Sequence, residues 1–300
     1  MLIENSFLYD LIREPYKISK LKFDSILKII RTIKNILEEE NLLLEFNVKE
    51  KDEEVYVIGD IHGNLETLMK LIEIINNNNP KLVIFLGDIV DRGPKQLECL
   101  LIILALKILS PLKYYILRGN HETLEMNQYY GFFQDFILRF NDQNKFNEIL
   151  SIYDVIPICA VINGTVLCLH GGIPQDIDIL KKLTGKKCNE FNILFNLISQ
   201  GIFQIMWNDP KSGLHGFSDS FRGSGIKFFG SDAFENFMQY NNLKYLIRSH
   251  ECFPEGYQWF FNNRLLSIFS SANYRGFYAP NPASYAIIRN NKIIPKIVEI

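Results

Sequence analysis

Two kinds of hydrophobic pattern alternate along the first half of the chain. Short, continuous apolar runs are typical of buried strands, and the longer segments between them place apolar residues at helical spacing. The runs predict strands at 55–58, 82–86 and 114–117, and the longer segments predict helices at 64–75, 95–109, 125–140 and 145–153. Residues 20–46 place Ile and Leu at helical spacing with charges on the other face, which predicts one or two amphipathic helices.

After about residue 155 the pattern changes, and strand-like runs follow one another with fewer helices between them. The predicted strands are 155–162, 165–169, 244–248, 264–269 and 284–289, and segment 186–207 is interpreted as a helix. Together the two halves predict a mixed α/β (α+β) fold whose sheets pack together under flanking helices. We interpret residues 20–300 as one domain and residues 1–19 as an N-terminal extension, because the chemically suggestive residues are spread over the whole later span.

The composition gives no indication of a nucleic-acid or membrane partner. The 300 residues are 47% hydrophobic with a formal net charge of −2, so no global field predicts binding to nucleic acid or to a membrane surface. The longest apolar run, 97–109, is interrupted by Lys107 and is too short to cross a bilayer. The N-terminus lacks a signal-peptide core, and five cysteines without paired spacing indicate reduced thiols. We expect a soluble protein of the cytoplasm or nucleus.

Polar side chains able to bind metal follow several predicted strands, usually beside a glycine. They occur in "VYVIGDIHGN" (55–64), "LVIFLGDIVDRG" (82–93), "YYILRGNHE" (114–122), "VLCLHGG" and "YLIRSHE". These side chains are Asp60, His62, Asp88, Asn120, His121, His170 and His250. Strand ends are rigid, and a flanking glycine lets backbone and ligand approach closely. Strands of one sheet that end together would therefore bring these side chains to a single point.

The ligand types indicate the metals. Carboxylate, amide and imidazole groups without thiolate suit manganese, iron or zinc. Six ligands of these types are too many for one ion and suit two divalent ions that share a bridging carboxylate, with Mn²⁺ as the first expectation and Fe or Zn as alternatives. Two ions about 3.5–4 Å apart can activate a hydroxide for direct, in-line attack at phosphorus. The pattern therefore predicts a dinuclear phosphoester-hydrolysing site.

The alternative is that the histidines have a purely structural role. A single histidine at a strand end is more often a hydrogen-bonded structural residue than a ligand. Four of the five histidines in this chain nevertheless follow an apolar strand within a few residues. The exception is His215 in the loop-like "SGLHGF", which we expect at the surface. Packing alone does not account for four such placements.

Two arginines could bind the phosphate. Arg92 comes directly after "GDIVD", so its guanidinium should lie near Asp88, and Arg222 lies in "FRGSG". A guanidinium can bind phosphate oxygens through two parallel hydrogen bonds, which a lysine cannot do. Arg222 by itself is weak evidence, since most arginines are surface charges.

The motifs "GDIHG", "GDIVDRG", "RGNHE", "HGG" and "RSHE", in this order, resemble the phosphoprotein phosphatase (PPP) family of two-metal serine/threonine phosphatases. The resemblance covers roughly residues 20–290. Within the family, "LRGNHETLEMNQYYGF" and "IRSHECFPEGY" are most similar to the catalytic domain of protein phosphatase five. The resemblance implies a metallophosphoesterase-like central β-sandwich flanked by helices, and hydrolysis of phosphoserine and phosphothreonine in proteins.

The resemblance also implies roles for individual residues. Asp60 and His62 would bind the first metal, Asp88 would bridge both, and Asn120, His170 and His250 would complete the second. His121 would be the general acid that protonates the leaving oxygen, with Asp91 holding its imidazole. The substrate-binding residues would be Arg92, Asn120, Arg222, Tyr130 and Tyr274. This chain reads "SSANYR" where the family usually has "SAPNYC", so Ala272 replaces a proline and Arg275 a cysteine; the first change is expected to loosen the loop.

Two other functions stay open. A metallophosphoesterase that acts on nucleotides or other phosphoesters would share "GDxHG", "GNHE" and "HGG". An inactive scaffold that binds phosphoproteins should have lost a ligand or the acid, and none is lost here. The expected partners are phosphoprotein substrates. Regulatory subunits are a further expectation, because no regulatory segment flanks the core of this chain.

Overall fold

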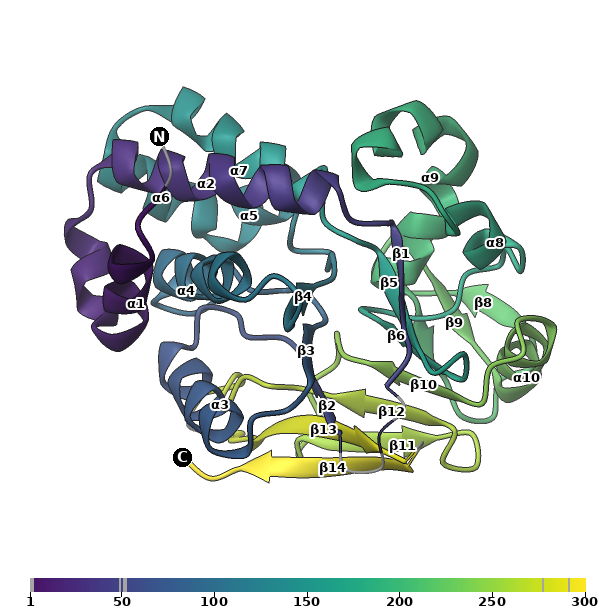
Figure 1. Ribbon diagram of the computed structural model, residues 1–300. Helices are drawn as coiled ribbons and strands as arrows, with labels where there is room; N and C mark the ends of the chain where they lie inside the picture. The colour runs from purple at the N-terminus through teal and green to yellow at the C-terminus, as the bar shows by residue number, and fades with distance from the viewer. Residues whose placement is uncertain (1–2, 49, 51–52, 277, 291) are drawn as a thin grey trace.

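Two large sheets lie against each other at the centre of the molecule, in a computed structural model that describes residues 3–48, 50, 53–276, 278–290 and 292–300 (Figure 1). The five-stranded sheet has the order β14-β13-β2-β3-β4, and the six-stranded sheet has the order β1-β5-β6-β10-β12-β11. A smaller sheet has the order β7-β9-β8.

The strand bounds are as follows. The five-stranded sheet contains β2 (Val55–Ile58), β3 (Leu82–Phe85), β4 (Tyr114–Ile116), β13 (Ala283–Arg289) and β14 (Lys292–Val298). The six-stranded sheet contains β1 (Leu43–Phe46), β5 (Cys159–Ile162), β6 (Val166–Leu169), β10 (Tyr245–Arg248), β11 (Tyr257–Phe260) and β12 (Leu265–Ile268). The small sheet contains β7 (Asp209–Pro210), β8 (Phe217–Asp219) and β9 (Lys227–Phe229).

Side chains that point alternately to the two faces of each strand form the two apolar layers of the sandwich. Val57 and Ile84 of one sheet share a buried apolar cluster with Cys168, Ile247 and Leu266 of the other. Successive side chains point to opposite faces of a strand, so the neighbours of Val57 and Ile84 face away from this layer. They belong to a second cluster, which includes the helices. The expected central β-sandwich under flanking helices is confirmed.

The helices cover the outer faces of the sandwich. They are α1 (Asn5–Arg13), α2 (Phe23–Glu38), α3 (Leu65–Asn78), α4 (Gln96–Leu109), α5 (Leu124–Tyr130), α6 (Phe132–Phe140), α7 (Phe146–Tyr153), α8 (Ile179–Leu183), α9 (Phe191–Trp207) and α10 (Ser231–Tyr240). Short 3₁₀ turns span Pro15–Lys20, Gln143–Lys145 and Cys188–Glu190. α4 is apolar on nearly all sides because α1, α2 and α3 pack around it (Figure 1). No helix in the described part of the chain is both long and apolar enough to cross a bilayer.

Most predicted elements are present, and three differ. Residues 43–46 form strand β1 rather than the end of a helix, because they pair with β5 in parallel. The helix predicted at 125–140 is divided at Gly131, whose φ of 116° is not helical. Within residues 1–19, which were interpreted only as an extension, helix α1 packs on α4.

Parallel pairing places the strand ends together. β2, β3 and β4 run parallel, and so do β6, β10 and β12. The carboxyl ends of parallel strands meet at the same edge of a sheet. The polar motifs that follow these strands therefore gather where the two sheets meet.

A buried ion pair ties α4 to the segment after α2. Lys107 is 0% exposed and donates hydrogen bonds to the carboxylate of Glu40 and to the carbonyl of Pro111 (2.7 Å). Its ammonium also lies 3.9 Å from the centre of the Tyr115 ring. Burial lowers the pKa of Lys107 and raises the pKa of Glu40, so desolvation opposes the charged form of each partner.

Removing one partner of this pair should destabilise the fold more than removing both. We expect Lys107→Met to lower the free energy of unfolding by about 3–5 kcal/mol, because Glu40 is left buried without its cation. The Glu40→Gln/Lys107→Met double variant should lose less than the sum of the single variants. Urea denaturation measures the free energy of unfolding of the single and double variants. The control is Lys70→Met, since exposed Lys70 pairs with Glu73 and should contribute less than ~1 kcal/mol; an equal loss in the two lysine variants would contradict the expectation.

Candidate metal centre and active site

Four donor groups from four loops surround one point at the junction of the sheets. Nε2 of His170 lies 2.9 Å from Oδ1 of Asn120, 3.1 Å from Nδ1 of His250 and 3.3 Å from Oδ2 of Asp88. The loops follow β3, β4, β6 and β10, so both sheets contribute. All four side chains are buried.

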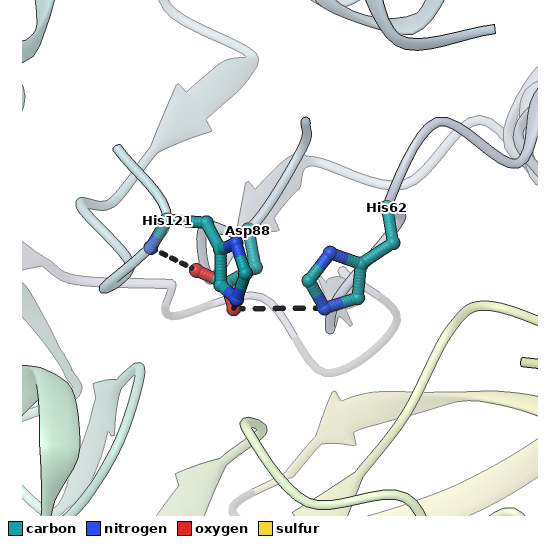
Figure 2. Close-up of side chains that lie close together, drawn as sticks. All are labelled: His62, Asp88 and His121. Atoms are coloured by element: carbon teal, nitrogen blue, oxygen red, sulfur yellow. Dashed lines mark hydrogen bonds and ion pairs between the residues drawn. The ribbon is translucent and has the colours of Figure 1, made fainter. Parts of the chain in front are cut away.

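A second donor set shares Asp88 with the first. Nε2 of His62 lies 3.5 Å from Oδ2 of Asp60 and 3.7 Å from Oδ2 of Asp88. Figure 2 shows the imidazole of His62 directed toward Asp88, and His121 lies beside the same carboxylate, to which its backbone N–H donates. Asp88 thus lies between the two sets, as a bridging carboxylate would.

The hydrogen bonds of the histidine rings indicate which nitrogen faces the site. Nδ1 of His62 lies 3.0 Å from the carbonyl oxygen of Val90, and Nδ1 of His170 lies 3.0 Å from that of Leu86. A carbonyl only accepts, so in a neutral ring Nδ1 carries the proton and Nε2 presents a lone pair to the site. In His250, Nδ1 faces the site, and the buried Nε2 has no partner among the described residues.

This arrangement fits cations. Unprotonated ring nitrogens, an amide oxygen and carboxylate oxygens are all acceptors, and acceptors brought within 2.9–3.3 Å of one another repel unless a proton or a cation lies between them. The donor set of nitrogen and oxygen without sulfur suits Mn²⁺, Fe or Zn²⁺. All five cysteines are buried and free, and none belongs to the two donor sets.

The pKa values of Asp88 and His62 also indicate that the buried carboxylates need positive charge nearby. Burial raises the pKa of Asp88, but the positive charges of His170 and His121 outweigh it and hold that pKa well below its usual range. Burial lowers the pKa of His62, but its hydrogen bond to Asp60 and the charge of Asp88 outweigh it and raise this pKa to about 9. The carboxylates therefore need positive charge close by, from protonated histidines or from metal ions.

His121 belongs to a separate chain of hydrogen bonds. Its Nδ1 lies 2.7 Å from Oδ2 of Asp91, and the same oxygen accepts from Nδ2 of Asn127 at 2.9 Å. Asn127 in turn donates to the His121 carbonyl (2.8 Å) and accepts from the hydroxyl of Tyr153 (3.0 Å). With Nδ1 occupied in this way, Nε2 of His121 faces the metal centre, 3.9 Å from Asp88. The arrangement fixes the ring as the carboxylate of a catalytic triad does.

Glu122 holds two of the ligand-bearing loops together. Its carboxylate accepts from the backbone N–H groups of Asp88 (2.8 Å), Ile89 (3.0 Å) and Gly119 (2.8 Å). The sequence reasoning missed Glu122, Asn127 and Tyr153, because their partners lie far from them in sequence or belong to the backbone. For Glu122 a signal existed, since it is part of "RGNHE".

Aromatic rings surround the two histidines at the mouth of the site. Tyr274 stacks on His62 with ring centres 5.0 Å apart, and Tyr130 lies 4.9 Å from His121. The guanidinium of Arg92 is 3.6 Å from the centre of the Tyr130 ring. Arg92 is therefore near the metal centre, although its side chain is exposed. His215 is exposed at the surface, as expected from its sequence context.

Arg222 reaches the site through a buried network. Its Nε donates to Asp209 (2.6 Å), which also accepts from the fully buried Arg248 (2.8 Å). Burial, then the charge of Arg222, lowers the pKa of His250 well below its usual range. Arg248 and Asp209 were not predicted, although Arg248 is the arginine of "RSHE".

The two departures in "SSANYR" have direct contacts. The N–H of Ala272, which a proline would lack, donates to Oγ1 of Thr67 (3.4 Å), and the Ala272 carbonyl accepts from Asn64 (2.9 Å). Arg275 donates to the carbonyl of Cys252 (2.6 Å). Both contacts attach the loop to neighbouring segments.

Gly87 and Gly119, which lie side by side in two different loops, let these ligand-bearing loops pack closely. Gly87 has a φ of 104°, and a Cβ there would lie 2.3 Å from the nitrogen of Gly119. A Cβ on Gly119 would lie 2.3 Å from Oδ1 of Asp88. Real Cβ atoms do not make such contacts, so the position of Asp88 depends on both glycines.

Comparison with known proteins agrees with this geometry. The family model described as calcineurin-like phosphoesterase matches residues 54–254, which contain all the metal-ligand candidates. A solved Saccharomyces cerevisiae protein serine/threonine phosphatase with similarity to human phosphatase PP5 superposes with a TM-score of 0.82 over 99% of this chain and 96% of that chain, at 24% identity. The cold-active protein-tyrosine phosphatase of a Shewanella species has a TM-score of 0.61 over 88% of this chain and 84% of that chain, at 17% identity. The fold and the site define a calcineurin-like phosphoesterase.

Two curated relatives place the chain more closely. It is 35% identical over 265 residues to "Serine/threonine-protein phosphatase rdgC" of Drosophila melanogaster, matching 82% of this chain and 39% of the relative. It is 32% identical over 240 residues to "Putative serine/threonine-protein phosphatase C22H10.04" of Schizosaccharomyces pombe, matching 79% of this chain and 76% of the relative. The chain thus belongs to the serine/threonine protein phosphatase family, although it spans only about two fifths of rdgC.

A methyl group at Gly119 should displace Asp88 and weaken metal binding. We expect Gly119→Ala to retain less Mn²⁺ than the parent protein after dialysis, because the added Cβ overlaps the carboxylate of the shared ligand. Metal content per chain, measured by mass spectrometry, tests this. Gly201→Ala, within helix α9, is the control: that Cβ would meet side-chain atoms of Ile179 in α8 and of Asp176 but no ligand candidate, so its metal content should match the parent. Equal retention by both variants would refute the steric argument.

Proposed function

We propose that this protein hydrolyses phosphoserine and phosphothreonine esters of proteins. The observation that carries the proposal is the His121–Asp91 pair, fixed at 2.7 Å beside a carboxylate that two donor sets share. It combines an acid for the leaving oxygen with a place for two cations. Membership of the serine/threonine protein phosphatase family supports the same substrate class.

The cofactors in this proposal are two divalent ions. Asp60, His62 and Asp88 would hold one, and Asp88, Asn120, His170 and His250 would hold the other. When bound, the ions would neutralise phosphate charge and lower the pKa of a coordinated water. Mn²⁺ is the first expectation, and Fe or Zn suits the same donors.

The side chains would divide the remaining work. Arg92 and Arg222 would bind the phosphate oxygens, and Asp209 and Tyr130 would hold the two guanidinium groups in place. His121 would donate the proton of Nε2 to the leaving serine or threonine oxygen. Asp91 accepts the hydrogen bond from Nδ1 of His121 and so holds the ring with Nε2 toward the substrate. Tyr274 would cover the site beside His62, and Asn120 would contact substrate as well as metal.

Two other functions compete with the proposal. Phosphatases that act on nucleotides would share the metal ligands, so the ligands do not discriminate. The Arg222–Asp209–Arg248 network and the family match favour a protein substrate. An inactive scaffold is disfavoured because every expected ligand and the acid are retained and lie together. Regulatory subunits and a cytoplasmic or nuclear location are part of the proposal and are supported only by the sequence.

The general-acid role can be separated from metal binding by two variants. We expect His121→Asn to lower kcat on a phosphothreonine peptide by about 10²–10⁴-fold while two metals per chain are kept. Asp88→Asn should lose both metal and activity, because the shared carboxylate is gone. Kinetics with metal-stripped, Mn²⁺-refilled protein, alongside metal analysis, measure both effects.

The matched control is His215→Asn, at an exposed histidine outside the site, which should keep the parent kcat. A fully active His121→Asn enzyme would refute the role of His121. A dinucleotide polyphosphate, assayed in parallel, tests the alternative substrate class. Faster turnover of that compound than of the phosphopeptide would overturn the proposed protein specificity.

A further inference from the structure

A hollow of about 430 Å³ opens beside the metal centre, within the range of about 300–1,000 Å³ that is usual for ligand sites. The residues at the start of α3, the turn before α4 and the loop 271–274 form its walls. Its remaining lining residues, among them Lys95, Glu66 and Asn273, have no role in the proposed phosphate chemistry.

The hollow is continuous with the phosphate site because it shares residues with it. His62, Arg92 and Tyr274 line it, and Tyr274 stacks on the His62 ring at 5.0 Å. An extended peptide advances about 3.3–3.6 Å per residue. A substrate whose phosphoresidue lies at the metal centre therefore brings a residue one to three positions away into the hollow.

The walls of the hollow are held in place by hydrogen bonds. Asn64 donates to the carbonyl of Ala272 (2.9 Å) and accepts from the N–H of Thr67 (3.1 Å). The hydroxyl of Thr67 in turn accepts from the N–H of Ala272 (3.4 Å), which exists only because this position is not proline. These bonds join α3 to the loop that carries Tyr274, so the shape of the hollow is set before a substrate arrives.

The charge of the hollow is its distinctive property. Lys95 and Arg92 line it from one side, both are exposed, and neither pairs with an acidic side chain among the described residues. Glu66 is the single acidic residue of the lining, and Ser271 and Asn273 are neutral. By comparison, the exposed lysines Lys70 and Lys81 pair with Glu73 and Glu53. Lys95 thus leaves a positive charge available at the edge of the substrate path.

We propose that this hollow is a substrate-specificity subsite for an acidic side chain, and that Lys95 is the residue that recognises it. The inference rests on the proposed function and names a feature of its substrates: an aspartate or glutamate within three residues of the phosphoserine or phosphothreonine. Arg92 is committed to the phosphate, so Lys95 is the cation free to bind the second anion. Glu66 carries a negative charge, so it repels the acidic side chain and reduces the preference for it.

The test compares phosphothreonine peptides that differ only by Asp or Ala at each position from −3 to +3. The parent enzyme, loaded with Mn²⁺, should show a higher kcat/KM for Asp at one position, by about two- to fivefold, the range for exposed ion pairs. Lys95→Ala should abolish this ratio, and Lys95→Glu should invert it. Glu66→Gln should increase it. Raising the salt concentration should shrink the parent ratio, because exposed charges are screened.

Two controls keep the outcomes distinct. Lys292→Glu makes the same charge change at an exposed lysine of β14 that does not line the hollow, and it should keep the parent ratio. A small aryl phosphate, too short to reach the hollow, normalises each variant for changes at the metal centre. Peptide turnover with the same Asp/Ala ratio in the parent, Lys95→Ala and Lys95→Glu enzymes would overturn the subsite alone. Hydrolysis of the aryl phosphate without any peptide turnover would overturn the proposed function and the subsite with it.

Discussion

The structure depends on the burial of carboxylates where two sheets meet. Asp60 and Asp88 are each about 1% exposed and lie among imidazoles rather than water. An isolated buried carboxylate costs several kcal/mol or more, and two together repel each other as well. The site is stable only if positive charge and hydrogen bonds surround them. Protonated His62 and His170, or cations bound by their neutral rings, supply the charge, and the backbone N–H groups of His121 and His250 supply hydrogen bonds.

The backbone around these groups is strained in a consistent way. His62, Asp88, Asp91, Arg92 and His250 all have positive φ values between 47° and 75°, which side chains other than glycine seldom adopt. Such conformations cost about 1–3 kcal/mol each and persist only where the surroundings enforce them. Glu122 helps to hold Asp88 in this conformation by accepting its backbone N–H. Gln96 does the same for Asp91, because its side-chain oxygen accepts the backbone N–H of Asp91 at 2.7 Å. The reactive side chains are thus aimed by a rigid, strained frame.

A second set of residues holds the acid and the arginines in place through hydrogen bonds. Asn127 and Tyr153 hold the Asp91–His121 pair, and Asp209 joins Arg222 to the buried Arg248. Each of these partners is polar and lies where an unmade hydrogen bond would be costly. Because the networks are satisfied within the described protein, the ligands and the acid keep their geometry before substrate binds.

The sequence by itself determined the strands that precede the ligand motifs, most helices and the ligand candidates, because apolar periodicity and a glycine next to a polar residue are local signals. It also predicted the α+β class and the family through five short motifs. Only the tertiary structure decided that 43–46 pairs as a strand, that Glu122 joins two loops and that Asp209 links two arginines. Those contacts join residues far apart in the chain or use backbone groups, and neither leaves a periodic trace. The charge of Lys95 became informative only when folding placed it beside a hollow without an acidic partner.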